Sequence, residues 1–324
     1  MTLSFGLVSH LGWMVLFLSF VAPTFLAAQG GRGNEPQSAN LRQANELMRA
    51  DKPSEALTAV KREAEANPTS TAAANLLDVL GATTEARTIW QRRIDAAPDA
   101  AAKSVAQRAM AMSYAFDGDS ANTVKYEQMV IAYWMTREQA EPQNAFYQQG
   151  EMANEAARVA IDAGDLAAAE QWYRKGAELG LKEPEPKTHP KSLWDFRLAH
   201  ALGRLAARRG DGAEAQRQIA AARKILDGDA TMAAQQERFF PYLVGYVALY
   251  TNDLKTAEAE LTKALAISGN QSDPFMTCLL AMTCEKLGQA AKAKELYEKA
   301  YGLATAHNPP AAFVRPFARK KLGL

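Results

Sequence analysis

Thiol and imidazole side chains are scarce in this sequence, which contains two cysteines and four histidines among 324 residues. Cys278 and Cys284 are six positions apart on one expected helix, so a rise of 1.5 Å per residue places their Cα atoms about 9 Å apart. A disulfide requires a separation below about 7 Å, and we therefore expect two buried, free thiols. No two histidines have the spacing of ligands on one helix, so we expect no metal site. The sequence indicates no other cofactor.

An excess of charge of either sign is also absent, since 37 Lys and Arg residues balance 36 Asp and Glu residues. This balance argues against bulk attraction to nucleic acid or to anionic lipid, and we expect no nucleic-acid partner. The chain lacks a G-x-S-x-G elbow, a phosphate-binding G-x-x-x-x-G-K-[ST] loop, a G-x-G-x-x-G turn and an H-E-x-x-H helix. The sequence therefore predicts no catalytic residues.

Strand signals are missing as well, because Val, Ile and Thr form no alternating runs of useful length. Helical periods are present instead. In residues 198–226, apolar and small side chains recur every three or four positions before and after Gly210 and Asp211. Glycine accepts the left-handed conformation that ends a helix, and aspartate accepts amide hydrogens at the start of the next helix. The stretch is predicted to be a hairpin of two helices, with a close seam where Gly203 faces Ala215.

Copies of this unit recur along the chain, as expected of helix pairs that must stack on neighbours to bury their faces. The small residue after each turn stands at Ala56, Ala86, Thr123, Ala169, Ala215, Ala257 and Ala293. The unit resembles the tetratricopeptide repeat, in which a helix with a leucine and a glycine or alanine precedes a turn often written Gly-Asp. The resemblance implies an all-α, right-handed superhelical solenoid of about seven tetratricopeptide-like helix pairs over residues 40–324. The uneven spacing of the small residues predicts that longer helices or loops interrupt the superhelix.

A capping helix is expected after Asn308, because the last pair of a solenoid needs its exposed face covered. The apolar side chains that would lie on the final pair are Phe313, Val314, Phe317 and Leu322. The basic side chains that would face the solvent are Arg315, Arg319, Lys320 and Lys321. The segment 182–191 contains three prolines and is predicted to be an exposed loop.

The amino-terminal segment, residues 1–28, contains no Lys, Arg, Asp or Glu and includes a mainly apolar run over residues 11–26. This pattern is typical of a secretory signal peptide, cleaved near Ala28. The run is short for a bilayer span, which needs about 20 residues, but an uncleaved anchor is the alternative. Residues 29–39 are polar and glycine-rich, and we interpret them as a flexible linker. We expect a periplasmic or secreted bacterial protein.

The resemblance also implies a concave groove lined by the first helix of each pair. The side chains expected to face it are Asn154, Arg158, Arg197, His200, Arg204, Arg208, Phe239, Tyr242, Tyr246 and Tyr250. Arginine pairs with carboxylates through two hydrogen bonds and tyrosine supplies rigid contact area, so the set is suited to an extended peptide. It is similar in kind to the carboxylate clamps of co-chaperone tetratricopeptide domains, although Arg and His replace most of their Lys/Asn/Arg set. The alternative is that the arginines are only solvated and the aromatic residues pack against neighbouring helices.

Together these features predict an exported scaffold or adaptor that binds a protein or peptide partner in its groove. A membrane-tethered adaptor of an envelope complex is the alternative if residues 1–28 are retained, and only that form would engage a membrane. An enzyme whose site is assembled from scattered Arg, His and Glu residues is the least favoured interpretation.

Overall fold

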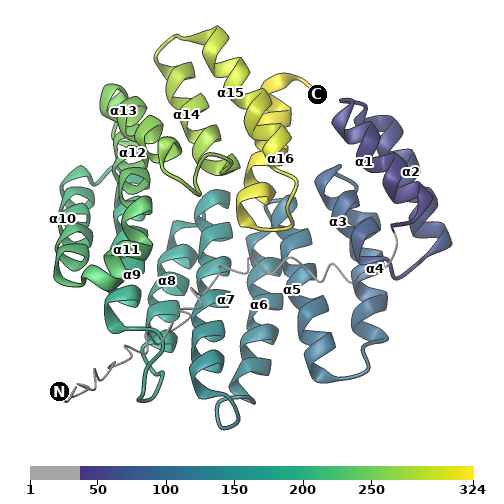
Figure 1. Cartoon of the computed structure of the whole chain (residues 1–324), viewed down its shortest axis with the longest axis horizontal. Helices are drawn as coiled ribbons and strands as arrows, with labels where there is room; N and C mark the ends of the chain where they lie inside the picture. Colours follow the sequence, from purple (N-terminus) through teal and green to yellow (C-terminus); the bar gives the residue numbers. More distant parts are fainter. Residues whose placement is uncertain (1–36) are drawn as a thin grey trace, which may run out of the picture. The chain divides into compact units, whose positions relative to one another are not determined.

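The computed structural model describes residues 37–324, which form sixteen α-helices and one 3-10 helix, with no strand in that range (Figure 1). Consecutive helices pack against each other in pairs. The paired helices are α1 (Ala39–Arg49) and α2 (Pro53–Ala66), α3 (Thr71–Val79) and α4 (Thr83–Asp95), α5 (Ala100–Phe116) and α6 (Ser120–Met135), α7 (Pro142–Ala163) and α8 (Leu166–Gly180), α9 (Lys191–Arg208) and α10 (Gly212–Gly228), α12 (Phe240–Tyr250) and α13 (Leu254–Ala266), and α14 (Pro274–Lys286) and α15 (Ala290–Leu303). The short helices α11 (Ala230–Gln236) and η1 (Glu237–Phe239) interrupt the series, and α16 (Pro309–Leu322) ends it. The predicted all-α solenoid of helix pairs is confirmed.

The turn between α9 and α10 shows why the Gly-Asp pattern marks the middle of a pair. Gly210 has a φ of 77°, a left-handed conformation that costs glycine little. The side chain of Asp211 accepts a hydrogen bond from the backbone N–H of Glu214 at 2.9 Å, which satisfies one of the free donors at the start of α10. In the α12–α13 turn, Asn252 takes the left-handed position with a φ of 65°. These contacts are local, so the pattern is readable from the sequence.

A close helix contact occurs where the end of α8 meets α9. Gly180 lies against the ring of Trp194, and a Cβ added at Gly180 would be 2.1 Å from Trp194 Cε2. Because Trp194 is among the largest fully buried side chains, its ring has little room to move.

We expect Gly180→Ala to lower the free energy of unfolding by about 1–3 kcal/mol, because the added methyl group must displace the Trp194 ring. Urea unfolding followed by circular dichroism measures the loss. Gly228→Ala is the matched control, since Gly228 also ends a helix but a Cβ there would have no neighbour within 4 Å. Equal effects of the two substitutions would contradict the close contact.

Helix α16 packs on α14 and α15, as predicted for a cap, and it also contacts α3, α5 and α7 (Figure 1). The expectation that Arg315 faces the solvent is wrong, because only 4% of this residue is exposed. Its Nε donates to the Val79 carbonyl at 2.9 Å and its Nη1 donates to the Tyr301 carbonyl at 2.8 Å. Val79 is the last residue of α3, so Arg315 satisfies a carbonyl at the end of that helix. The next three basic residues of α16 are exposed.

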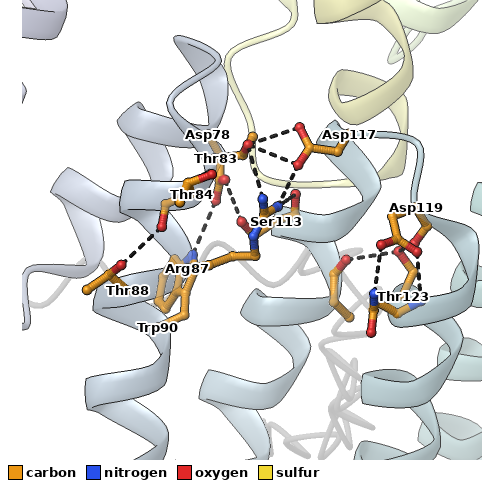
Figure 2. A network of polar contacts seen from close by, with 12 residues as sticks. Asp78, Thr83, Thr84, Arg87, Thr88, Trp90, Ser113, Asp117, Asp119 and Thr123 are labelled. Atoms are coloured by element: carbon orange, nitrogen blue, oxygen red, sulfur yellow. Dashed lines mark hydrogen bonds and ion pairs between the residues drawn. The ribbon is translucent and has the colours of Figure 1, made fainter.

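The same end of α3 carries a buried carboxylate, Asp78, which is 1% exposed. It accepts hydrogen bonds from Trp90 Nε1 at 3.2 Å and from Ser113 Oγ at 2.6 Å, so groups from α3, α4 and α5 converge there (Figure 2). His307 Nε2, from the loop before α16, lies 2.9 Å from the same carboxylate. Both carboxylate oxygens therefore have partners, and the network ties α16 to the first repeats.

The predicted signal peptide and most of the predicted linker lie outside the described residues. Within residues 37–324, none of the helices has the length and apolar character needed to cross a bilayer. Residues 181–190 contain no helix, which confirms the loop predicted between α8 and α9. Cys278 and Cys284 are buried and free, as predicted.

Candidate functional site: an arginine cluster on α7 and α9

Three arginines lie close enough to Asp162 to act on its charge, Arg158 on α7 and Arg204 and Arg208 on α9. We call these three residues the arginine cluster. Arg204 and Arg208 are four positions apart, so they stand on one face of α9. Tyrosines from α8 and α12 surround them.

Arg204 is the deepest member of the cluster, with 7% of its surface exposed. Its Nη1 donates to Tyr242 Oη at 3.2 Å and its Nη2 donates to Tyr173 Oη at 3.1 Å, while its buried Nε has no hydrogen-bond partner. Burial alone would lower the pKa of Arg204, but the nearby phenol oxygens and the carboxyl of Asp162 raise it, so the side chain stays charged. This buried cation forms no ion pair with any residue of 37–324.

Arg158 and Arg208 are half-buried and complete the cluster. Arg208 Nη1 donates to Tyr246 Oη at 3.4 Å, and its Cζ lies 4.9 Å from the centre of the Tyr250 ring. Arg158 Cζ lies 4.9 Å from the centre of the Phe275 ring on α14, and its Nε has no hydrogen-bond partner. Aromatic faces attract guanidinium groups, but they do not neutralise them.

Asp162 is a carboxyl that interacts electrostatically with all three arginines. It stands four residues after Arg158 on α7 and forms no hydrogen bond or ion pair within residues 37–324. Burial raises the pKa of Asp162 to about 6, although Arg158, Arg204 and Arg208 oppose the rise. The cluster and Asp162 together contain three guanidinium groups and one carboxyl group, so they have an excess of positive charge. Because the cluster is partly shielded from water, an unpaired charge there raises the free energy of the folded state.

His200, one turn before Arg204, does not add to this charge. Burial lowers its pKa well below the ordinary value of 6.5, and Arg204 and Arg158 lower it further, whereas a hydrogen bond to the Phe239 backbone opposes the shift. The imidazole is therefore neutral at pH 7, and its buried Nε2 has no partner. The ring lies 5.1 Å from the ring of Tyr242.

Most of the residues predicted to line the groove are thus brought together, but they differ in depth. Tyr242 and Tyr246 are buried against neighbouring helices, as the alternative interpretation expects of the aromatic residues. His200 and Arg204 lie under the surface as well, so only Arg158, Arg208 and Tyr250 are partly open to solvent. Tyr173, Asp162 and Phe275 also belong to this site and were not among the residues predicted to line the groove. The i,i+4 spacing of Arg158 and Asp162 was the available signal for Asp162.

Three predicted residues belong elsewhere. Arg197 pairs with Glu151 and lies 5.0 Å from the Trp194 ring, in a separate network. The side chain of Asn154 lies against Gly176, in the seam between α7 and α8. Phe239 lies in η1; its backbone forms a hydrogen bond with His200, but its ring centre lies 4.6 Å from Arg238 Cζ.

The paired helices define the class as an α-helical repeat protein. The tetratricopeptide repeat family model matches residues 277–307, which cover most of α14 and all of α15. The last helix pair, α14 and α15, therefore matches a tetratricopeptide repeat. Among solved structures, it is similar to a tetratricopeptide repeat protein from Parabacteroides merdae ATCC 43184, with 14% identity, a TM-score of 0.43, and coverage of 82% of this chain and 91% of that chain. No curated protein matches the sequence.

Proposed function

We propose that this protein is an exported scaffold that binds an acidic segment of a protein partner at the arginine cluster. Helical-repeat solenoids present extended surfaces for such partners. The observation that carries the proposal is the excess positive charge of the cluster, above all the buried Arg204, which forms no ion pair within residues 37–324. Carboxylates of a partner would supply the missing charge through two-point hydrogen bonds.

The partner would touch the outer members of the cluster. Arg158 and Arg208 are half-buried and make few hydrogen bonds, so their guanidinium groups have donors to offer. Tyr250 is half-buried beside Arg208 and adds aromatic contact area. Arg204 lies beneath and raises the local potential without touching the partner.

We expect the double substitution Arg158→Gln with Arg208→Gln to weaken partner binding by about tenfold or more, because each charge-assisted hydrogen bond contributes roughly 1.5–3 kcal/mol. Capture of proteins from an envelope fraction, quantified against added salt, measures this, since binding of carboxylates should weaken at high ionic strength. The control is Arg49→Gln with Lys320→Gln, which removes two exposed charges from other helices. An unchanged set and amount of captured proteins in the cluster variant would contradict the proposal.

Export rests on residues 1–28, whose uncharged, mainly apolar composition is that of a signal peptide. Amino-terminal sequencing of the protein from its native host tests this part. A mature chain beginning near Gln29 supports a periplasmic or secreted scaffold, and retention of the segment supports the membrane-tethered adaptor instead. Either result leaves the binding surface on α7 and α9 unchanged.

A further inference from the structure

A cavity of about 250 Å³ lies where the ends of α5 and α7 meet α16. Its inner wall contains Val159 and Ala312, which are buried, whereas Gly118, Ala163 and Pro316 are exposed. The cavity is therefore open to solvent on one side and closed on the other. It is separate from the surface of Arg158 and Arg208, since neither arginine lines it.

The walls of the cavity are mainly apolar and partly aromatic. Phe116 of α5 and Phe313 and Phe317 of α16 contribute rings, and the last two are stacked with centres 5.2 Å apart. An aromatic ligand would meet these rings in edge-to-face or offset contacts. The volume is sufficient for one ring, because an apolar cavity of about 150 Å³ already holds benzene.

Two acidic side chains line the cavity, and they differ in whether the protein already donates hydrogen bonds to them. Asp117 accepts hydrogen bonds from Thr83 Oγ1 at 2.9 Å and from Arg87 Nη1 at 2.7 Å, so its carboxylate is engaged (Figure 2). Asp162 accepts none, and its Oδ2 is buried without a partner. Because Asp162 forms no hydrogen bond within residues 37–324, a ligand in the cavity that donates a hydrogen bond would meet a carboxyl group that no protein donor engages.

The surrounding charges restrict which donor is suitable. The three guanidinium groups of the arginine cluster lie close enough to act on the charge of Asp162, and they repel an ammonium group bound beside it. The carboxylates of Asp162 and Asp117 repel an anion. A neutral hydroxyl group avoids both penalties, and its proton satisfies the carboxylate.

We propose that this cavity binds a small phenolic molecule, with its ring between α5 and α16 and its hydroxyl group donating to Asp162. Binding of a phenol would satisfy the unpartnered carboxylate and fill the apolar space in one step. The inference does not rest on the proposed scaffold function, because it concerns another ligand and a cavity that neither Arg158 nor Arg208 lines, although Asp162 interacts electrostatically with the arginine cluster.

The test uses the full chain and three fluorinated probes, 4-fluorophenol, fluorobenzene and 4-fluorobenzylamine, followed by ¹⁹F NMR titration at pH 8, where Asp162 is ionised. We expect 4-fluorophenol to bind at least tenfold more tightly than either other probe, because a hydrogen bond to a buried charged group is strong. Asp162→Leu should remove this preference while fluorobenzene still binds. Ala163→Leu, at the exposed rim, should weaken all binding by filling the entrance. Asp227→Asn, on the exposed face of α10, is the control and should change nothing.

Circular dichroism of each variant shows whether it is folded. If Asp162→Leu does not fold, Ala163→Leu still tests the site, because residue 163 is exposed and its substitution should not prevent folding. The proposal is overturned if no probe binds the wild-type chain, which would indicate a cavity that holds only water. Equal affinity for 4-fluorophenol and fluorobenzene would also overturn it, as would tightest binding of the amine. Binding that survives Ala163→Leu would place the probe elsewhere.

Discussion

Replacing Arg315 with methionine is expected to lower the free energy of unfolding by roughly 3–5 kcal/mol, because a buried cation that donates to two backbone carbonyls is removed. The carbonyl of Val79 loses its donor at 2.9 Å and the carbonyl of Tyr301 loses its donor at 2.8 Å. The guanidinium group also lies 3.7 Å from the centre of the Tyr301 ring, and this contact is lost as well. Since Arg315 joins α16 to the end of α3, the second helix pair and the capping helix should separate more easily.

Urea unfolding measures the loss of stability, and native-state hydrogen exchange measures whether α16 and the end of α3 separate more easily. In the variant, amide protection should fall together in α16 and in the last turn of α3, because the two elements lose one shared contact. Lys320→Met is the matched control, since Lys320 is an exposed long cation on the same helix. If Lys320→Met costs as much, or if exchange in α3 is unchanged, Arg315 does not hold the ends of the solenoid together.

The helix pairs were predictable because their signals are local. The hydrogen bond from the Glu214 amide to Asp211 spans three residues, and the conformation of Gly210 depends on that residue alone. A short stretch of sequence therefore contains everything that decides the turn. The same reasoning gave the loop at 182–191, where prolines remove backbone donors.

The position of α16 was not predictable by such reasoning. Arg315 stands among exposed basic residues, and the partner that buries it, Val79, is 236 positions earlier in the chain. The residues around the arginine cluster were likewise only partly predictable from local spacing. Spacing along α9 and α12 predicted that Arg204 and Tyr242 line the same groove from adjoining helices, and the two side chains do form a hydrogen bond. Their burial depends on which other helices cover them, and short-range patterns do not contain that information.

A second large effect is expected at Glu127 on α6, where Glu127→Gln should stabilise the protein at alkaline pH. Glu127 is 0% exposed and neither of its carboxyl oxygens has a hydrogen-bond partner of ordinary geometry. Burial raises its pKa well above the ordinary value of 4.5, and the charge of Glu155 raises it further, although Arg108 opposes this. Arg108 is already paired with Glu155, with 3.0 Å between Arg108 Nε and Glu155 Oε2, so its charge is largely compensated before it acts on Glu127.

The sign of the effect follows from proton linkage. The folded chain keeps a proton on Glu127 that the unfolded chain releases above about pH 4.5, so stability is full below that pH and falls as the pH rises toward the folded-state pKa. Glutamine has the same shape and no proton to lose, so it removes this dependence. We expect similar unfolding free energies for the two proteins at pH 5 and an advantage of roughly 2–4 kcal/mol for Glu127→Gln at pH 9.

Urea titrations at pH 5, 7 and 9 measure this divergence, with Glu295→Gln as the control because Glu295 is exposed on α15. The control should follow the wild type at every pH. A Glu127→Gln variant that is less stable than the wild type, and increasingly so at higher pH, would show instead that Glu127 is ionised and attracted by Arg108. In that case the buried carboxylates on α6 and α7 would share one arginine, and their repulsion would have to be offset by contacts elsewhere in the repeat.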